Sequence, residues 1–95
     1  ALRVDPSLAG AWNNKGTSLF RLGRYRDALA AYEQALRLEP GNAHTHRNRG
    51  SALLALGRWR EAADAFRAAL RVDPKLDGAR RGLEHSIRML EEERR

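Results

Sequence analysis

The chain has 95 residues, the length of one small domain, and a chain of this size buries too little surface for a deep enzyme-type interior. It contains no cysteine, which excludes a disulfide framework and thiolate metal sites. Its 18 basic and 12 acidic residues give a net charge of +6, which favours acidic partners. The longest apolar run, 52–56, is too short to cross a membrane and no leader pattern is present, so we expect a cytoplasmic protein.

Two helices are predicted first, because apolar residues recur at the three- and four-residue spacing of one helical face. The first helix runs from about residue 9 to residue 22, and Gly23 then favours a left-handed turn. The second begins near Tyr25 and ends before Pro40, since the residue before a proline is pushed out of helical geometry. A connection this short makes the two helices antiparallel neighbours.

The next two predicted helices repeat this layout, with Gly57 as the turn and Pro74 at the end. When the chain is shifted by 34 residues, residues 9–42 fall on residues 43–76, and 14 of the 34 aligned pairs are identical. The small residues Gly16 and Ala28, repeated as Gly50 and Ala62, are predicted to lie where the two helices of each hairpin cross. The chain is therefore a helical repeat protein. A fifth helix is predicted from Asp77, with a strongly polar end.

The spacing within each unit resembles the tetratricopeptide repeat, whose pattern is W-x₂-L-G-x₂-Y, then A-x₃-F, then P, in a period of 34 residues. The first unit reads Trp12-x₂-Lys15-Gly16-x₂-Leu19, then Ala28-x₃-Tyr32, then Pro40, and the second reads His46-x₂-Arg49-Gly50-x₂-Leu53, then Ala62-x₃-Phe66, then Pro74. Lys15 and Arg49 stand where the pattern has Leu, and His46 replaces the Trp. In the third unit the Gly is lost, because position 84 is Glu84.

The resemblance implies an all-α fold, a right-handed superhelix of two helical hairpins closed by a capping helix. The expected organisation is a remnant of a preceding repeat at 1–8, repeats at 9–42 and 43–76, and a C-terminal capping helix at 77–95. The chain opens in the middle of the repeat pattern, so we expect it to be a fragment of a larger protein.

The resemblance also implies a non-catalytic scaffold that binds a protein or peptide in a concave groove lined by the first helix of each unit. The groove positions carried onto this chain are Asn13, Asn14, Thr17, Phe20, Arg21, His44, Arg47, Asn48, Ser51, Leu54, Arg81, His85 and Arg88. Asn14 and Asn48 offer a donor and an acceptor each, which suits holding an extended peptide backbone. The alternative interpretation is that they are repeat consensus with no ligand.

The arginines of the groove set, Arg47, Arg81 and Arg88, favour an acidic peptide, because guanidinium groups bind carboxylates with two hydrogen bonds. Some chaperone-binding members of the family grip a C-terminal carboxylate with Lys and Asn from three successive units. Thr17 and Asn48 fit that clamp, but Asn13, Gly78 and Gly82 leave it without the expected cations.

Two other functions remain open from the sequence. The segment Arg24-Tyr25-Arg26, repeated as Arg58-Trp59-Arg60, is a rim of guanidinium groups that suggests nucleic-acid binding, although a solvated rim explains it as well. Self-association into a homo-oligomer through the open N-terminal repeat edge is the second alternative.

Catalytic, metal and cofactor sites are not expected. His44 and His46 are two residues apart, so on a helix they point to different sides and cannot share a metal ion. The Ser and Thr residues have no His and Asp at useful spacing. The glycines are explained by turns and helix crossings rather than by a phosphate loop.

Overall fold

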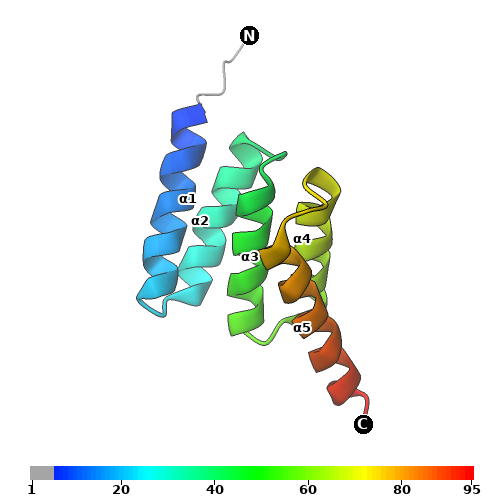
Figure 1. Ribbon diagram of the computed structural model, residues 1–95. Helices are drawn as coiled ribbons and strands as arrows, with labels where there is room; N and C mark the ends of the chain where they lie inside the picture. The colour runs from blue at the N-terminus through cyan, green and yellow to red at the C-terminus, as the bar shows by residue number, and fades with distance from the viewer. Residues whose placement is uncertain (1–5) are drawn as a thin grey trace.

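The computed structural model describes residues 6–95, and these residues form five α-helices joined by short turns. The helices are α1 (Pro6–Arg21), α2 (Tyr25–Leu38), α3 (Ala43–Ala55), α4 (Trp59–Val72) and α5 (Asp77–Glu93). Figure 1 shows α1 to α4 side by side in chain order as two antiparallel hairpins, with α5 lying against α3 and α4. No strand occurs within 6–95. The fold is the predicted all-α helical solenoid.

The turn inside each hairpin is closed by a glycine in the left-handed region, as the sequence predicts. Gly23 has φ +78° and Gly57 has φ +75°. In the first turn the Gly23 amide donates to the Phe20 carbonyl over 2.9 Å and the Arg24 amide donates to the Leu19 carbonyl over 2.9 Å. The second turn repeats both hydrogen bonds. These two bonds satisfy carbonyl groups that the end of a helix leaves without a partner, so the glycine is required at this position.

The start of the first helix differs from the prediction. α1 begins at Pro6 rather than near residue 9, and a proline is well suited to a first helical position because its missing amide is not needed there. Residues 1–5 lie outside the described residues, so the remnant of a preceding repeat stays a prediction.

The aromatic residue of each second helix occupies the space beside the glycine of the first helix. A Cβ atom added to Gly16 would lie 2.6 Å from the Tyr32 ring, and one added to Gly50 would lie 2.8 Å from the Phe66 ring. The sequence predicts glycine at these helix crossings, with Ala28 and Ala62 opposite. The nearest side chains are instead the aromatic rings, which lie 2% and 1% exposed in the core.

The helix α5 packs on the second hairpin through a different glycine. Ala79 and Ser86 of α5 are buried, and Gly82 approaches Phe66 so closely that an added Cβ atom would overlap the ring. Position 84, where the repeat pattern has a glycine, is Glu84, as the sequence shows. The close approach of α5 to the second hairpin is made through Gly82 instead.

Side chains at the positions that depart from the repeat pattern link neighbouring elements. Arg49 of α3 makes an ion pair of 3.2 Å with Glu33 of α2 and so joins the two hairpins. His46 donates from Nε2 to the Pro40 carbonyl oxygen over 2.7 Å, since a carbonyl can only accept. Lys15 of α1 places its Nζ 5.0 Å from the centre of the Trp12 ring.

Candidate functional site

A pocket of about 280 Å³ opens between α1 and α3, the first helices of the two repeats. Its walls are Thr17, Phe20, Arg21, Tyr32, Arg47, Asn48 and Ser51. Six of these seven residues belong to the groove set predicted from the sequence. The seventh, Tyr32, was assigned to the core because it follows the apolar spacing of α2. Helical spacing indicates the direction in which the Cβ atom of Tyr32 points. It does not indicate whether the long side chain of Tyr32 also reaches the groove.

A chain of hydrogen bonds forms the floor of this pocket. Thr17 Oγ1 donates to the Asn13 carbonyl oxygen over 3.1 Å. The hydroxyl of Tyr32 lies 3.1 Å from the same Thr17 oxygen, and it must be the donor there because the Thr17 proton is already used. The hydrogen bond to Thr17 therefore holds the hydroxyl group of Tyr32 at the pocket.

The two asparagines of the predicted set that flank the pocket bind each other across the two repeats. Asn48 Nδ2 of α3 donates to Asn13 Oδ1 of α1 over 3.1 Å. On the same side of the pocket, Ser51 Oγ donates to the Arg47 carbonyl oxygen over 3.2 Å. The hydroxyl groups of Thr17 and Ser51 thus each donate to a carbonyl of their own helix, as serine and threonine inside helices commonly do.

The free charges at this pocket are all positive. Arg21 and Arg47 make no ion pair within the described residues. No aspartate or glutamate occurs in α1 or in α3. The acidic residues nearest in sequence to Arg21 and Arg47 are Asp27, in the first turn of α2, and Glu39, which follows the last residue of α2. The pocket therefore offers guanidinium donors and no competing carboxylate.

The placement of Arg47 depends on the start of α5. A Cβ atom added to Gly78 would lie 2.9 Å from Arg47 Cδ and 3.1 Å from its Nη1. The side chain of Arg47 therefore occupies the space that a side chain at position 78 would fill. This contact joins α3 to α5 at the edge of the groove.

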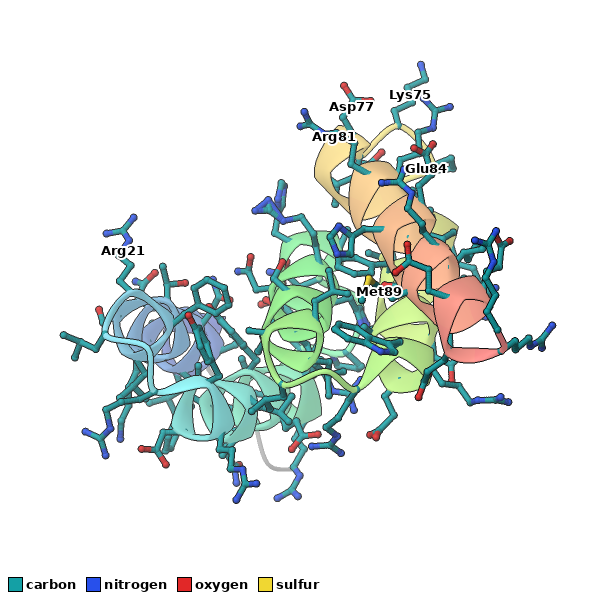
Figure 2. The ribbon with its side chains drawn as sticks, turned by 90° about the horizontal axis from the view of Figure 1, so that it is seen from below. Arg21, Lys75, Asp77, Arg81, Glu84 and Met89 are labelled. Carbon is teal, nitrogen blue, oxygen red and sulfur yellow. The ribbon has the colours of Figure 1, made fainter. Side chains whose placement is uncertain are left out.

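The other predicted groove residues lie outside this pocket. Leu54 packs against the hydrophobic core and is partly buried. Asn13 is half-buried, and the remaining members are exposed, namely Asn14, His44, Arg81, His85 and Arg88. Figure 2 shows Arg21 of α1 and Arg81 of α5 pointing to the same side of the molecule. The sequence pairs Asn14 with Asn48, but only Asn48 lines the pocket.

A larger pocket, about 480 Å³, lies outside the groove on the first hairpin. It is lined by Trp12, Lys15 and residues of α2. One repeat later, the residue equivalent to Lys15 is Arg49, which contacts α2 of the preceding hairpin. Likewise Ala11 is exposed here, whereas its equivalent Thr45 is 2% exposed. This surface thus corresponds to the face through which one hairpin packs on the previous one.

The arginine rim differs from a row of four free guanidinium groups. Arg24 pairs with Asp27 and Arg58 pairs with Glu61, each over 2.6 Å. Hydrogen bonds from Arg58 hold the pKa of the Glu61 carboxyl below its usual range, and Glu61 in turn raises the pKa of Arg58. These pairs lie at the starts of α2 and α4. Two of the four rim arginines, Arg24 and Arg58, are therefore engaged in ion pairs that support the first turns of these helices.

Residues 6–95 contain neither a metal-binding cluster nor a membrane-spanning helix. No three His, Asp or Glu side chains of this part of the chain converge in a way that would bind a metal ion. In the same residues, every helix is too short or too polar to traverse a bilayer.

Known structures share this architecture over nearly the whole chain. The first TPR of Spaghetti (RPAP3) bound to the HSP90 peptide SRMEEVD matches with a TM-score of 0.91 and 23% identity, over 97% of this chain and 73% of that chain. The yeast Sti1 TPR2AB domain in complex with pHSP90 matches with a TM-score of 0.90 and 25% identity, over 94% of this chain and 34% of that chain. The Sgt2 TPR domain from Aspergillus fumigatus matches with a TM-score of 0.85 and 27% identity, over 88% of this chain and 56% of that chain.

Sequence comparison gives two results. No curated protein sequence matches the chain. The pattern of the tetratricopeptide repeat matches residues 13–77, which include most of both hairpins and the start of α5. Together with the 34-residue step, the Gly turns and the shared architecture, this match shows that the chain belongs to the tetratricopeptide repeat family.

Proposed function

We propose that this chain is a non-catalytic scaffold that binds an extended, acidic segment of another protein along the groove formed by α1, α3 and α5. The observation that carries the proposal is the pocket between α1 and α3, whose walls contain no acidic residue and two arginines that form no ion pair with any residue of 6–95. Opposite charge at such a surface directs the approach of a partner and disfavours basic ones.

The solved relatives support the same class of ligand. The Spaghetti (RPAP3) domain is bound to SRMEEVD, a peptide with three acidic residues, and the Sti1 domain is in a complex with pHSP90. The present chain has Asn13, Gly78 and Gly82 at clamp positions where a cation is expected, so we propose an acidic segment rather than that particular ligand.

The chemistry of the pocket favours binding over catalysis. Of its three hydroxyl groups, those of Thr17 and Ser51 donate to backbone carbonyls and that of Tyr32 donates to Thr17, and the pocket wall contains no histidine. A hydroxyl needs a neighbouring base to become a nucleophile. The pocket therefore offers hydrogen bonds and charge to a ligand, and no group prepared for bond making.

The proposal is tested by screening the chain against a library of random dodecapeptides and measuring the affinity of the retained peptides by fluorescence anisotropy. Ser51→Tyr places a ring in the pocket and is expected to abolish binding. Ser18→Tyr, at an exposed position of α1 outside the pocket, is the matched control and should bind like the parent chain. Circular dichroism verifies that both variants fold. Failure to retain any peptide, or equal binding by the two variants, would overturn the proposal.

A further inference from the structure

We infer that the outer face of the first hairpin binds an amphipathic helix of a partner protein, and that this helix brings one carboxylate to Lys15. The outer face is the side of the hairpin that carries Leu8, Ala11, Trp12, Lys15, Ser18 and Leu22. It lies outside the groove between α1 and α3, so the inference stands apart from the proposed function. Four observations support it.

The first observation is a stripe of exposed residues along α1. Leu8, Ala11, Lys15, Ser18 and Leu22 follow one another at steps of three and four residues, which places them on one side of a helix. Leu8 is 52% exposed and Leu22 is 72% exposed, and they are two of the three large apolar side chains exposed within 6–95. Apolar residues gathered on an exposed surface are typical of a binding face. Figure 1 shows α1 at one end of the row of helices.

The second observation is the shape of the space beside this stripe. The pocket of about 480 Å³ and a further pocket of about 340 Å³ share Trp12 and Lys15 in their walls, so they adjoin along α1. The larger pocket is also walled by Ala30 and Ala31 of α2. Because these side chains are small, the backbone of another helix can approach closely. A long opening between two helices suits a helix that lays its apolar face into it.

The third observation is that the chain shows what buries the same stripe one repeat later. The residues 34 positions after Ala11, Ser18 and Leu22 are Thr45, Ala52 and Leu56. Thr45 and Ala52 are buried, and Leu56 packs against the core. α4 packs on α3 as α2 packs on α1, so the additional burial in α3 comes from its contact with α2. The element that covers this stripe is therefore a helix.

The fourth observation is a cation without a carboxylate at the centre of the stripe. Arg49, the residue equivalent to Lys15, forms an ion pair of 3.2 Å with Glu33 of the preceding hairpin. Lys15 forms no ion pair with any residue of 6–95, and its Nζ lies 5.0 Å from the centre of the Trp12 ring. A helix that brings a carboxylate to the place of Glu33 would complete the same pairing at Lys15.

A second copy of this chain is a poor source of that helix. Within the described residues, the face of α2 that packs on the next hairpin is covered by α3, and the corresponding face of α4 is covered by α5. Both faces are thus occupied inside one molecule. Two copies would also repel each other, since each has a net charge of +6. We therefore assign the helix to another protein.

The probe for this face is a peptide with the sequence of residues 24–39, which contains α2, the helix that packs on the equivalent stripe. A hydrocarbon staple between positions 30 and 34, which border the outer pocket rather than α3, keeps this short peptide helical. The peptide has three basic and three acidic residues, so the net charge of the chain has little effect on its binding. Fluorescence anisotropy should show saturable binding, and its absence would overturn the inference.

An exchange of charges tests the role of Lys15. Lys15→Glu in the chain and Glu33→Lys in the peptide should each weaken binding roughly three- to fivefold, the range of an exposed ion pair. The two changes together should restore most of the affinity. Arg81→Glu, the same charge change at an exposed position of α5, is the matched control and should bind the peptide like the parent chain. If the combined changes bound no better than either one alone, Lys15 would not receive the carboxylate.

Two tyrosine variants separate this face from the groove. Ser18→Tyr places a ring on the outer face and should abolish binding of the stapled helix while leaving the groove peptides bound, and Ser51→Tyr should do the reverse. Equal binding of the helix by Ser18→Tyr and the parent chain would overturn the inference and leave the proposed function intact. Sedimentation across a range of concentrations tests the second copy. A monomer supports the inference, whereas a dimer that Ser18→Tyr abolishes would assign the face to self-association instead.

Discussion

Phe66 lies between two glycines from different helices, Gly50 of α3 and Gly82 of α5, and is 1% exposed. Gly82→Ala inserts a methyl group into the ring, which cannot move away because Gly50 is close to it as well. Overpacking usually costs about 1–3 kcal/mol and the helix gain offsets about 1 kcal/mol of it, so we expect a net loss of up to about 2 kcal/mol of unfolding free energy.

Gly10→Ala is the reference for this prediction, because it brings the same helix gain at a position where nothing lies within 4 Å. Urea denaturation followed by circular dichroism should show Gly10→Ala more stable than the parent chain and Gly82→Ala less stable. If both variants gained stability, the close packing of α5 on Phe66 would be contradicted.

The ion pair between Arg58 and Glu61 makes a pH-dependent contribution to stability. Arg58 lowers the pKa of Glu61, so the unfolded chain binds more protons than the folded chain near the usual carboxyl pKa of about 4.3. The contribution is therefore present above that value and is lost as the pH falls through the lower folded-state pKa. The pair is exposed, so the effect is small.

Glu61→Gln should accordingly be slightly less stable than the parent chain at neutral pH and equal to it in acid. Urea midpoints measured from neutral to acidic pH test this, with Glu84→Gln, which removes an exposed carboxylate outside the described ion pairs, as the control. A difference that persists in strong acid would mean that Glu61 acts through packing rather than charge.

At the scale of single residues, six members of the predicted groove set line the pocket between α1 and α3, but the sequence did not show what each side chain does there. Asn48 was predicted to bind a peptide, but one of its amide protons is donated to Asn13 Oδ1 within the protein. Gly78 was noted only as a missing cation, whereas its lack of a side chain makes room for Arg47. Contacts of this kind join residues about 31 to 35 positions apart, and helical periodicity carries no information about them.

The first helices of the two hairpins have different starts. α3 has a side-chain cap, since Asn42 Oδ1 accepts a hydrogen bond of 3.1 Å from the Thr45 amide. Asn42→Ala should destabilise the protein by about 1 kcal/mol, the usual cost of losing such a cap. Because α3 carries Arg47, Asn48 and Ser51, fraying of its start should also make peptide binding weaker.

Thermal unfolding of Asn42→Ala measures the first effect and fluorescence anisotropy measures the second. Asn42→Asp is the informative control, because aspartate also caps helices and should keep the parent stability. A stability loss of the same size in Asn42→Asp would point away from the capping bond.

The helix ends were the part of the fold most open to prediction, because their cause is local. The turns at Gly23 and Gly57 follow from the freedom of glycine at positive φ, and the structure confirms them. The packing of α5 was less predictable. The repeat pattern directs attention to position 84, where the family glycine is missing, whereas α5 makes its close approach through Gly82. Which residue of a terminal helix faces the preceding hairpin depends on a rotation that its own sequence does not set.

The two hairpins separate their charges between first and second helices, whereas α5 contains charges of both signs. α1 and α3 contain only basic charged residues, whereas α2 and α4 contain both kinds. Beyond short-range contacts at the pocket, a net charge of +6 produces a field that attracts acidic segments before they dock. These two effects act on different rate constants, since long-range attraction speeds association and close contacts slow dissociation.

The association rate of an acidic peptide should therefore fall roughly tenfold between low salt and about 1 M salt, where the screening length is only about 3 Å, while the dissociation rate changes far less. Arg47→Gln should mainly raise the dissociation rate, because it removes a short contact at the pocket. Arg37→Gln removes the same charge from α2 and should lower only the association rate, slightly and only at low salt. Stopped-flow fluorescence separates the rates. If Arg47→Gln behaved like Arg37→Gln at every salt concentration, Arg47 would contribute only to the overall field, and the specificity of the groove would have to come from Phe20, Tyr32 and Asn48.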